Sequence, residues 1–436
     1  MKSVCLFFQV HQPFRYRKYR FFDIGNDHYY YDDYTNESVL RNIALKSYLP
    51  TNQLLLKLAD KLEGKFKVAF SITGTALEQF SLYMPEVIES FQKLAKTGCV
   101  EFLSETYSHS LASLSDAEMF KKQVNLHEES ILGLFGQKPR VFRNTEMIYS
   151  DEIGEQVAKM GYKAILTEGA KQVLGWKSPN FLYVNAINPR LKVLMRNFKL
   201  SDDISFRFSN QNWSEYPLTA DKFVKWMENT DKREEVINLF LSYESFGEWQ
   251  PADSGIFDFL EALPTKIVES KKLQFATPTE VLEDLQPVSA VHVPHPISWA
   301  DEERDLTAWL GNTMQKEAFG KLYNLQKRMK LVADTKMLKD WNYLQESDHF
   351  YFMSTKYSTG GATPKTDNPY GSPYEAFINY MNVLSDFRIR LNTFVPENEQ
   401  EYEIAALNKI ISEKEEKIKT LEATVRRLQK GKKKGK

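Results

Sequence analysis

The sequence has very few cysteines: Cys5 and Cys99 are the two in 436 residues. Two thiols cannot form a disulfide framework or a four-thiolate metal site, and such sparing use fits a reducing compartment. Long apolar runs are also lacking, since runs such as Val4–Val10 are far shorter than the roughly 20 residues of a membrane helix. The N-terminus has neither a long apolar stretch nor a small-residue cleavage site. We therefore expect a cytoplasmic protein with no membrane partner.

An excess of charge of either sign is lacking too. Lysine and arginine total 57 against 58 acidic residues, and the formal net charge is −1. This balance gives no electrostatic reason to expect nucleic acid or an anionic membrane as partner. Aromatic residues, in contrast, are plentiful, with 29 Phe, 22 Tyr and 7 Trp. Their flat apolar faces are suited to stacking on ring-shaped ligands such as sugars.

Short apolar runs through the first 245 residues or so predict buried strands. Amphipathic helical stretches lie between several of them, for example Asn52–Leu62 and Asp151–Met160. This alternation predicts an α/β fold of parallel strands with helical crossovers, either open or closed into a barrel, with functional residues at the carboxyl ends of the strands. The predicted strands are Ser3–Val10, Phe66–Thr73, Val100–Leu103, Arg140–Arg143, Ala164–Thr167, Val193–Arg196 and Ile237–Tyr243.

A helical region is predicted after Asp301, because apolar residues from Leu306 to Leu325 have helical spacing and two further stretches, Met329–Glu346 and Tyr374–Phe394, follow. The loop Ser354–Ser372 between them is long enough to be functional. We expect three parts: a (β/α) barrel of catalytic type in 1–285, a helical bundle in 286–395, and a coiled-coil helix with a basic tail in 396–436.

The last segment has apolar residues at alternating spacings of three and four, interrupted by Lys414. So narrow a stripe on a charged helix favours self-association as a coiled coil. A single helix packed back on the bundle, or left partly frayed, remains the alternative. The run Lys430–Lys436 is expected to be a solvated tail. The stripe comprises Ile404, Leu407, Ile411, Ile418, Leu421, Val425 and Leu428.

Polar side chains follow four of the predicted strands. They are His11 and Gln12; Glu105 and His109; Glu146; and, in Leu239–Trp249, Glu244 and Trp249. Each has an ordinary structural interpretation, such as a buried histidine or a Glu146–Arg143 salt bridge, but four such motifs at successive strand ends indicate a site. No HExxH or similar metal-ligand spacing occurs, so we expect no metal. Glycoside cleavage commonly needs two carboxyl groups, with imidazoles, amides and aromatic rings holding the sugar. Glu146 is the best candidate for the nucleophile.

These motifs resemble those of glycoside hydrolase family 57, in particular its α-amylase branch, in five regions. The regions are His11-Gln12-Pro13, Gly98–His109, Phe142–Met147, Leu239–Trp249 and Ser298–Arg304. The resemblance implies a seven-stranded (β/α) barrel with a C-terminal helical bundle, acting on α-glucans or maltooligosaccharides by a retaining mechanism without a metal or other cofactor. It places Glu146 at the nucleophile position. The implied substrate-binding residues are His11, Gln12, Glu105, His109, Asp203, Glu244, Trp249, Trp299 and Asp301.

One residue departs from the family pattern: the position of the general acid, an aspartate in the family, is Ser242 here. A serine hydroxyl cannot protonate a glycosidic oxygen usefully near neutral pH, and loss of a general acid typically costs about 10² to 10⁴ in rate. We therefore expect an α-amylase-like protein of starch or glycogen metabolism that binds α-1,4-glucans with impaired catalysis.

Two alternatives stay open. One is an active retaining α-amylase or 4-α-glucanotransferase in which Asp202, Asp203, Asp253 or Glu244 replaces the acid. The other is a metal-dependent enzyme resembling polysaccharide deacetylases, with His11 and His109 as metal ligands.

Overall fold

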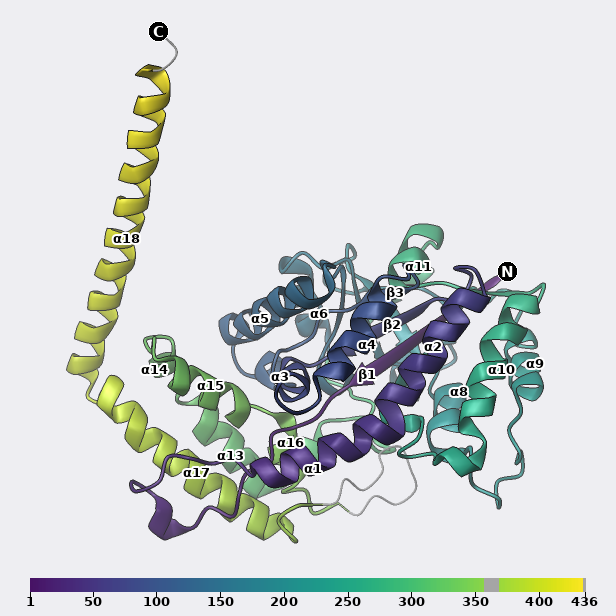
Figure 1. Ribbon diagram of the computed structural model, residues 1–436, viewed down its shortest axis with the longest axis horizontal. Coiled ribbons are helices and arrows are strands. Elements are labelled where there is room, and N and C mark those ends of the chain that lie inside the picture. The colour runs from purple at the N-terminus through teal and green to yellow at the C-terminus, as the bar shows by residue number, and fades with distance from the viewer. Residues whose placement is uncertain (357–367, 434–436) are drawn as a thin grey trace.

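The computed structural model describes residues 1–356 and 368–433. Its larger part is an α/β fold with two five-stranded sheets. The chain alternates strands and helices as expected, and helices α1 to α4 cover one side of the first sheet (Figure 1). The strands are β1 Lys2–Val10, β2 Val68–Ile72, β3 Val100–Phe102, β4 Val141–Arg143, β5 Ala164–Glu168, β6 Tyr183–Asn185, β7 Lys192–Arg196, β8 Val236–Ser242, β9 Leu273–Phe275 and β10 Ser289–Val291.

The helices vary from single turns to the 35 residues of α18. They are α1 Asp33–Ile43, α2 Leu49–Lys61, α3 Gly74–Tyr83, α4 Pro85–Ala95, α5 Ala117–Phe135, α6 Asp151–Lys159, α7 Lys171–Leu174, α8 Phe198–Asp202, α9 Ala220–Glu228, α10 Ile256–Glu269, α11 Pro278–Asp284, α12 Thr307–Leu310, α13 Thr313–Tyr323, α14 Gln326–Met329, α15 Thr335–Leu344, α16 Ser347–Tyr351, α17 Pro373–Phe394 and α18 Glu399–Lys433.

The first sheet has the order β3-β2-β1-β8, with β9 also paired to β1, and the second has the order β10-β6-β7-β5-β4. Every pairing is parallel except the antiparallel pair β6–β7. The seven predicted strands are present, which confirms the prediction of an α/β fold with parallel sheets. The three-residue strands β6, β9 and β10 were not predicted, although β3 and β4, which are equally short, were.

Strand β1 shows how the two sheets share an interior. Its side chains alternate, so that Leu6 and Phe8 pack in a core beneath the helices, while Cys5 and Phe7 pack in a second core. That second core also contains side chains from strands of the other sheet, such as Leu166 of β5. Burial on both faces explains why β1 is a nearly continuous apolar run. The two sheets do not form one closed ladder.

The helical region is more divided than the sequence predicts: the stretch Leu306–Leu325 contains two helices, α12 and α13, and the short helix α16 was not predicted. The stretch Met329–Glu346 was expected to be one helix, but α14 ends at Met329 and α15 begins at Thr335. Asp334 caps α15, since its side chain accepts a hydrogen bond from the Met337 backbone N–H. A capping carboxylate competes with a continuous helix at that position, which accounts for the break.

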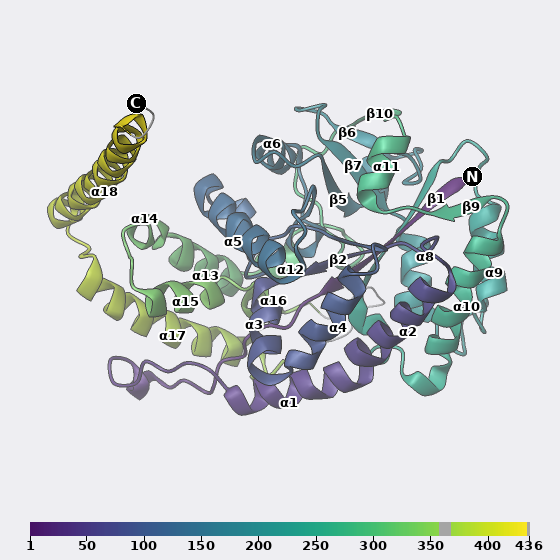
Figure 2. The same cartoon turned by 45° about the horizontal axis from the view of Figure 1, so that its top comes forward.

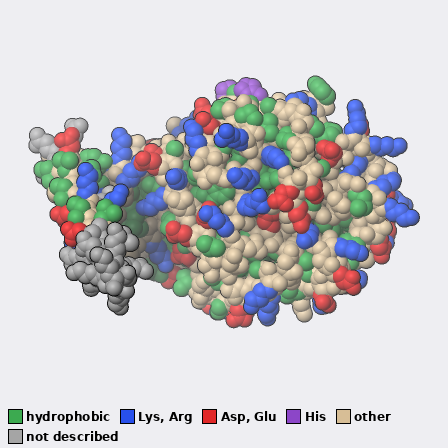
Figure 3. All heavy atoms as spheres, turned by 90° about the horizontal axis from the view of Figure 1, so that it is seen from above, with side chains coloured by type: hydrophobic (Ala, Val, Ile, Leu, Met, Phe, Trp, Pro, Cys, Tyr) green, Lys and Arg blue, Asp and Glu red, His purple; other side chains and the backbone are tan. Residues whose placement is uncertain are grey.

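Helices α13, α15 and α17 lie side by side, and α18 projects from the end of α17 (Figures 1 and 2). Most of the loop Ser354–Ser372 and the end of the basic tail, 434–436, lie outside the described residues. Within the described part of the chain no helix is long and apolar enough to cross a membrane. Basic and acidic side chains are intermixed over the face drawn in Figure 3.

Candidate active site

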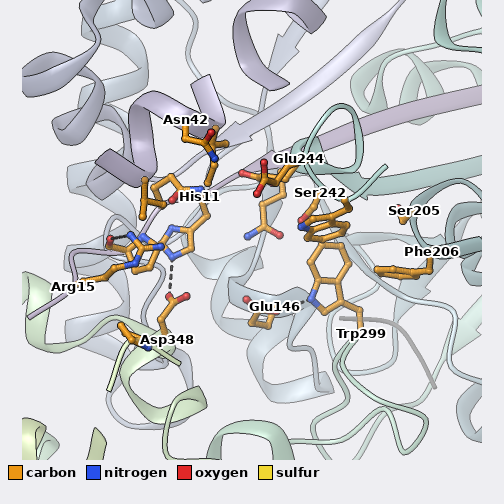
Figure 4. Close-up of a pocket in the computed structure, with 18 of the residues that line it drawn as sticks. His11, Arg15, Asn42, Glu146, Ser205, Phe206, Ser242, Glu244, Trp299 and Asp348 are labelled. Atoms are coloured by element: carbon orange, nitrogen blue, oxygen red, sulfur yellow. Dashed lines mark hydrogen bonds and ion pairs between the residues drawn. The ribbon is translucent and has the colours of Figure 1, made fainter. Parts of the chain in front are cut away.

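The carboxyl ends of the parallel strands meet at a cavity of about 760 Å³. This is the edge at which the sequence placed the functional residues, because loops after parallel strands converge there. Seven of the predicted residues line the cavity: His11, Gln12, Glu146, Ser242, Glu244, Trp249 and Trp299. Figure 4 shows ten labelled lining side chains, with Ser242 and Glu244 drawn apart from Glu146.

Glu146 lies in a strained turn directly after β4. Its φ of 53° and ψ of 27° are in the left-handed region, and Met147 has a φ of 53° as well. Such a conformation in residues other than glycine costs about 1–3 kcal/mol and persists where the surroundings hold it. Trp299 holds Glu146 in this conformation, because its backbone N–H donates to the Glu146 carbonyl at 3.2 Å and its indole N–H donates to Glu146 Oε2 at 2.6 Å.

The other oxygen of the Glu146 carboxylate, Oε1, accepts a hydrogen bond from His109 Nε2 at 2.6 Å. Burial raises the pKa of Glu146, but the hydrogen bond and charge of His109, the charge of Arg143 and the indole of Trp299 outweigh it. The net pKa is below the usual value, and Glu146 is therefore ionised at neutral pH. An ionised carboxylate is the form that a nucleophile requires.

A buried ionic network behind Glu146 holds His109 in place. His109 Nδ1 lies 3.3 Å from Glu105 Oε2, and Arg143 Nη1 lies 3.5 Å from the same oxygen. Burial lowers the pKa of His109, but Glu105 and Glu146 raise it to about 9, so that both ring nitrogens donate. Arg143 pairs with Glu105, and Glu146 contacts His109 in place of the Glu146–Arg143 salt bridge that was the structural alternative. Gln9 accepts a further bond from Arg143.

His11 stands at the cavity wall in contact with the helical region. Its Nε2 lies 2.8 Å from Asp348 Oδ2, its Nδ1 lies 2.9 Å from Thr73 Oγ1, and its ring stacks on His109 at 4.1 Å. Burial and the positive charge of His109 lower its pKa, against the opposite effect of Asp348. Both ring nitrogens are thus engaged by Thr73 and Asp348, which fixes the orientation of the ring at the cavity wall.

Ser242 and Glu244 form a different part of the cavity, at the end of β8. Ser242 is paired in the sheet with Gln9, which also lines the cavity. Glu244 is 7% exposed and accepts a hydrogen bond from the Tyr48 hydroxyl. Burial raises the pKa of Glu244 to about 7, although hydrogen bonds from Tyr48 and Gln12 act in the opposite direction.

A second buried ionic cluster lies beside Trp299. Arg196 pairs with Glu168 at 3.1 Å and with Asp202 at 2.5 Å, and Arg304 lies within 3.5 Å of both carboxylates. The guanidinium carbon of Arg196 is 5.6 Å from the centre of the Trp299 ring, and that of Arg143 is 5.2 Å away. Trp299 is thus fixed by cations as well as by its hydrogen bonds to Glu146.

Several predicted residues do not line the cavity. Asp203 is buried and pairs with Arg207 at 2.7 Å, and Asp301 pairs with Lys356 at 3.6 Å. Asp253 lies exposed in a short turn. Glu105 and His109 are in the network behind Glu146 and not among the side chains that line the cavity.

Lining residues that were not predicted from the sequence include Arg15, Arg196, Phe206 and Asp348. Arg196 ends a predicted strand, so its position at a strand end was a usable signal. Phe206 stacks on Trp249 with ring centres 5.6 Å apart, which extends the aromatic wall. Asp348 had no local signal, because it lies in a short helix and meets His11 across 337 residues of sequence.

His11 and His109 are the two metal ligands that the deacetylase-like alternative requires. His109 is occupied by two carboxylates and His11 by Thr73 and Asp348. Among the described residues no group of three or more His, Cys, Asp and Glu side chains is placed to hold a metal ion. The arrangement gives no support to the metal-dependent alternative.

Comparison with known proteins identifies relatives of this chain. The sequence model of glycosyl hydrolase family 57 matches residues 5–294. A relative from Methanocaldococcus jannaschii, named "Putative alpha-amylase", is 40% identical over 405 residues, which are 90% of this chain and 85% of the relative.

Two solved structures share the fold. A branching enzyme of the same family from Thermococcus kodakaraensis has a TM-score of 0.66 at 13% identity, over 93% of this chain and 94% of that one. The 4-alpha-glucanotransferase from Thermococcus litoralis has a TM-score of 0.63 at 16% identity, over 89% of this chain. This chain spans only 60% of that enzyme's length.

Proposed function

The chain belongs to glycosyl hydrolase family 57 and is α-amylase-like, and we propose that it binds an α-1,4-glucan in the cavity of Glu146 with strongly impaired hydrolysis. One observation carries this proposal. Glu146, at the proposed nucleophile position, is ionised and held by His109 and Trp299, whereas Ser242 brings no carboxyl group to the end of β8.

The lining of the cavity supports a sugar ligand. Trp249 and Phe206 form a stacked aromatic pair, and the carboxylate, imidazole and amide groups of Asp348, His11 and Gln12 line the same cavity. Aromatic faces bury the apolar faces of sugar rings, while the polar groups bind hydroxyls. A cavity of about 760 Å³ lies within the range of ligand pockets. The match to an α-amylase relative makes α-glucan the first class to test.

We also infer that the two sheets form one (β/α) barrel of the seven-stranded type. Three observations support this arrangement: the core shared by both sheets, a parallel bridge between Ser104 and Phe142 at one junction, and a hydrogen bond from Asn197 N–H to Asn238 C=O at the other. The helical part then covers the carboxyl ends of the strands as a bundle that supplies Asp348.

The direct test is repair of the acid. Purified protein should bind maltoheptaose in calorimetry and show little or no release of reducing sugar, whereas Ser242→Asp should raise the rate by about 10² to 10⁴. Ser242→Asn is the matched control, because it has similar size and no acidic proton. Robust turnover by the unmodified protein, or no heat with any α-glucan, would contradict the proposal.

A second function, an active retaining glycosidase or transglycosidase, is favoured by Glu244. Its carboxyl group lies in the same cavity, and burial raises its pKa to about 7, which suits an acid at neutral pH. In that case the unmodified protein hydrolyses or transfers maltooligosaccharides, and Glu244→Gln abolishes this activity as fully as Glu146→Gln. If Glu146→Gln abolishes the activity and Glu244→Gln does not, Glu244 has no role in the reaction.

A further inference from the structure

Helix α18 stands away from the rest of the protein over most of its length. Its first turns contact the body, where Tyr402 packs on the core of the helical region and Lys409 Nζ donates to the Lys330 carbonyl. Beyond these turns it projects from the end of α17 in both views (Figures 1 and 2). The apolar stripe of α18 is therefore not packed along the helical region. This argues against the alternative of a single helix packed back on the bundle.

The apolar side chains of this helix remain exposed. Each keeps more than half of its surface accessible: Ile404 58%, Leu407 59%, Ile411 53%, Ile418 55% and Leu421 56%. Ile404, Leu407 and Ile411, and then Ile418 and Leu421, are spaced three or four residues apart. With Lys414 between the two groups, they lie on one stripe along the helix. A contiguous apolar stripe of this kind marks an interaction surface, because single exposed apolar residues are common but aligned ones are not.

The residue types in the stripe indicate the number of strands. Ile404, Ile411 and Ile418 take heptad position a, followed in sequence by Val425, and Leu407 and Leu421 take position d, followed by Leu428. β-branched residues at a with leucine at d favour two strands in a parallel coiled coil. The stripe matches itself, so a second copy of this chain is the partner that it fits.

The charged positions beside the stripe separate the two orientations. In a parallel pair, Lys417 at position g lies opposite Glu422 at position e of the partner copy, and the same attraction occurs twice by symmetry. In an antiparallel pair centred on the stripe, Lys417 lies opposite Lys417 and Glu415 opposite Glu415. Like charges at those positions are unfavourable, so charge favours the parallel pair.

We propose that α18 pairs with α18 of a second copy of this chain in a parallel two-stranded coiled coil. Lys414 then occupies one d layer, where two ammonium groups extend to solvent on their apolar stems next to Glu415 of the other copy. A charged residue in a core layer weakens the pairing, so the dimer is concentration-dependent.

The test measures mass against concentration for the full chain, by sedimentation equilibrium. We expect a monomer–dimer equilibrium that Ile418→Asp shifts to monomer at all concentrations used. Thr420→Asp, on the outer side of the same turn, is the matched control and should leave the equilibrium unchanged. A monomer throughout, or a dimer unaffected by Ile418→Asp, would overturn the proposal.

Charge reversal tests the orientation. Lys417→Glu places like charges together twice in the parallel pair and should raise the dissociation constant about tenfold. The double variant Lys417→Glu with Glu422→Lys should restore it to within about threefold. In the antiparallel register Lys417→Glu exchanges one like pair for another, so an unchanged constant, or no rescue by the double variant, would refute the parallel arrangement.

Discussion

Glu244 gives a quantitative prediction about the stability of the fold. The residue is 7% exposed, and burial raises the pKa of its carboxyl group from 4.5 to about 7. A pKa difference of one unit between the folded and unfolded states corresponds to about 1.4 kcal/mol of stability. The raised pKa therefore lowers the free energy of unfolding by about 3 kcal/mol at pH values where the group is ionised in the folded protein.

The sign of this effect follows from where the proton is bound. Below pH 4.5 the group is protonated in both states, so its contribution is fully present. Between pH 4.5 and about 7 the folded state keeps a proton that the unfolded state has lost, and stability falls with rising pH. Above about pH 7 the loss is complete. The side chain in Glu244→Gln has a similar shape and does not titrate, so this variant lacks the fall in stability that the carboxyl group causes.

Urea denaturation between pH 4.5 and 8 measures the difference. The free energy of unfolding of Glu244→Gln minus that of the unmodified protein should rise across this range by about 3 kcal/mol. The exposed Glu261 on α10 provides the control, Glu261→Gln, which should show no comparable rise. A difference that stays constant with pH, or one that falls, would refute the assignment of a raised pKa to Glu244.

Three further outcomes are expected. Trp299→Phe should lower the free energy of unfolding by about 1.5–3 kcal/mol, because charged Glu146 loses its indole donor, and Trp249→Phe is the comparison. His109→Gln should destabilise the protein most below pH 6.5 and progressively less as pH rises through about 9, because the stabilising charge of His109 is lost there; a pH-independent loss would contradict this. If both proposals hold, the monomeric Ile418→Asp chain should bind maltoheptaose as before but long amylose at least tenfold more weakly, measured by affinity electrophoresis.

The sequence predicted the strands and the edge of the sheet that carries the site. Long strands such as Lys2–Val10 are buried on both faces, and their sequences are therefore largely apolar. Alternation with helices predicts the parallel pairing that is observed. Glu146 and Ser242 could be placed at strand ends for the same reason. Strand β6 and the break before Thr335 depend on a few local contacts that no periodic pattern reports.

The interaction partners of the predicted residues could not be predicted as well from the sequence. Adjacent acidic residues illustrate this: Asp202 pairs with Arg196 and Arg304, while Asp203 points to Arg207. Neighbours in sequence that face different ways cannot be told apart by composition. The contact of Asp348 with His11 arises because the helical part packs over the strand ends, and packing over so long a separation leaves no trace in either local segment.

The charges around the cavity explain why one substitution at Ser242 is an informative repair. On the Glu146 side of the cavity, His109 and Arg143 lower the pKa of that carboxylate. On the side of β8 the buried Glu244 has a raised pKa. An aspartate at position 242 would lie at the same strand end as Glu244, where burial raises the pKa of a carboxylic acid. We propose that these unequal environments would separate a nucleophile from a general acid if position 242 carried a carboxyl group.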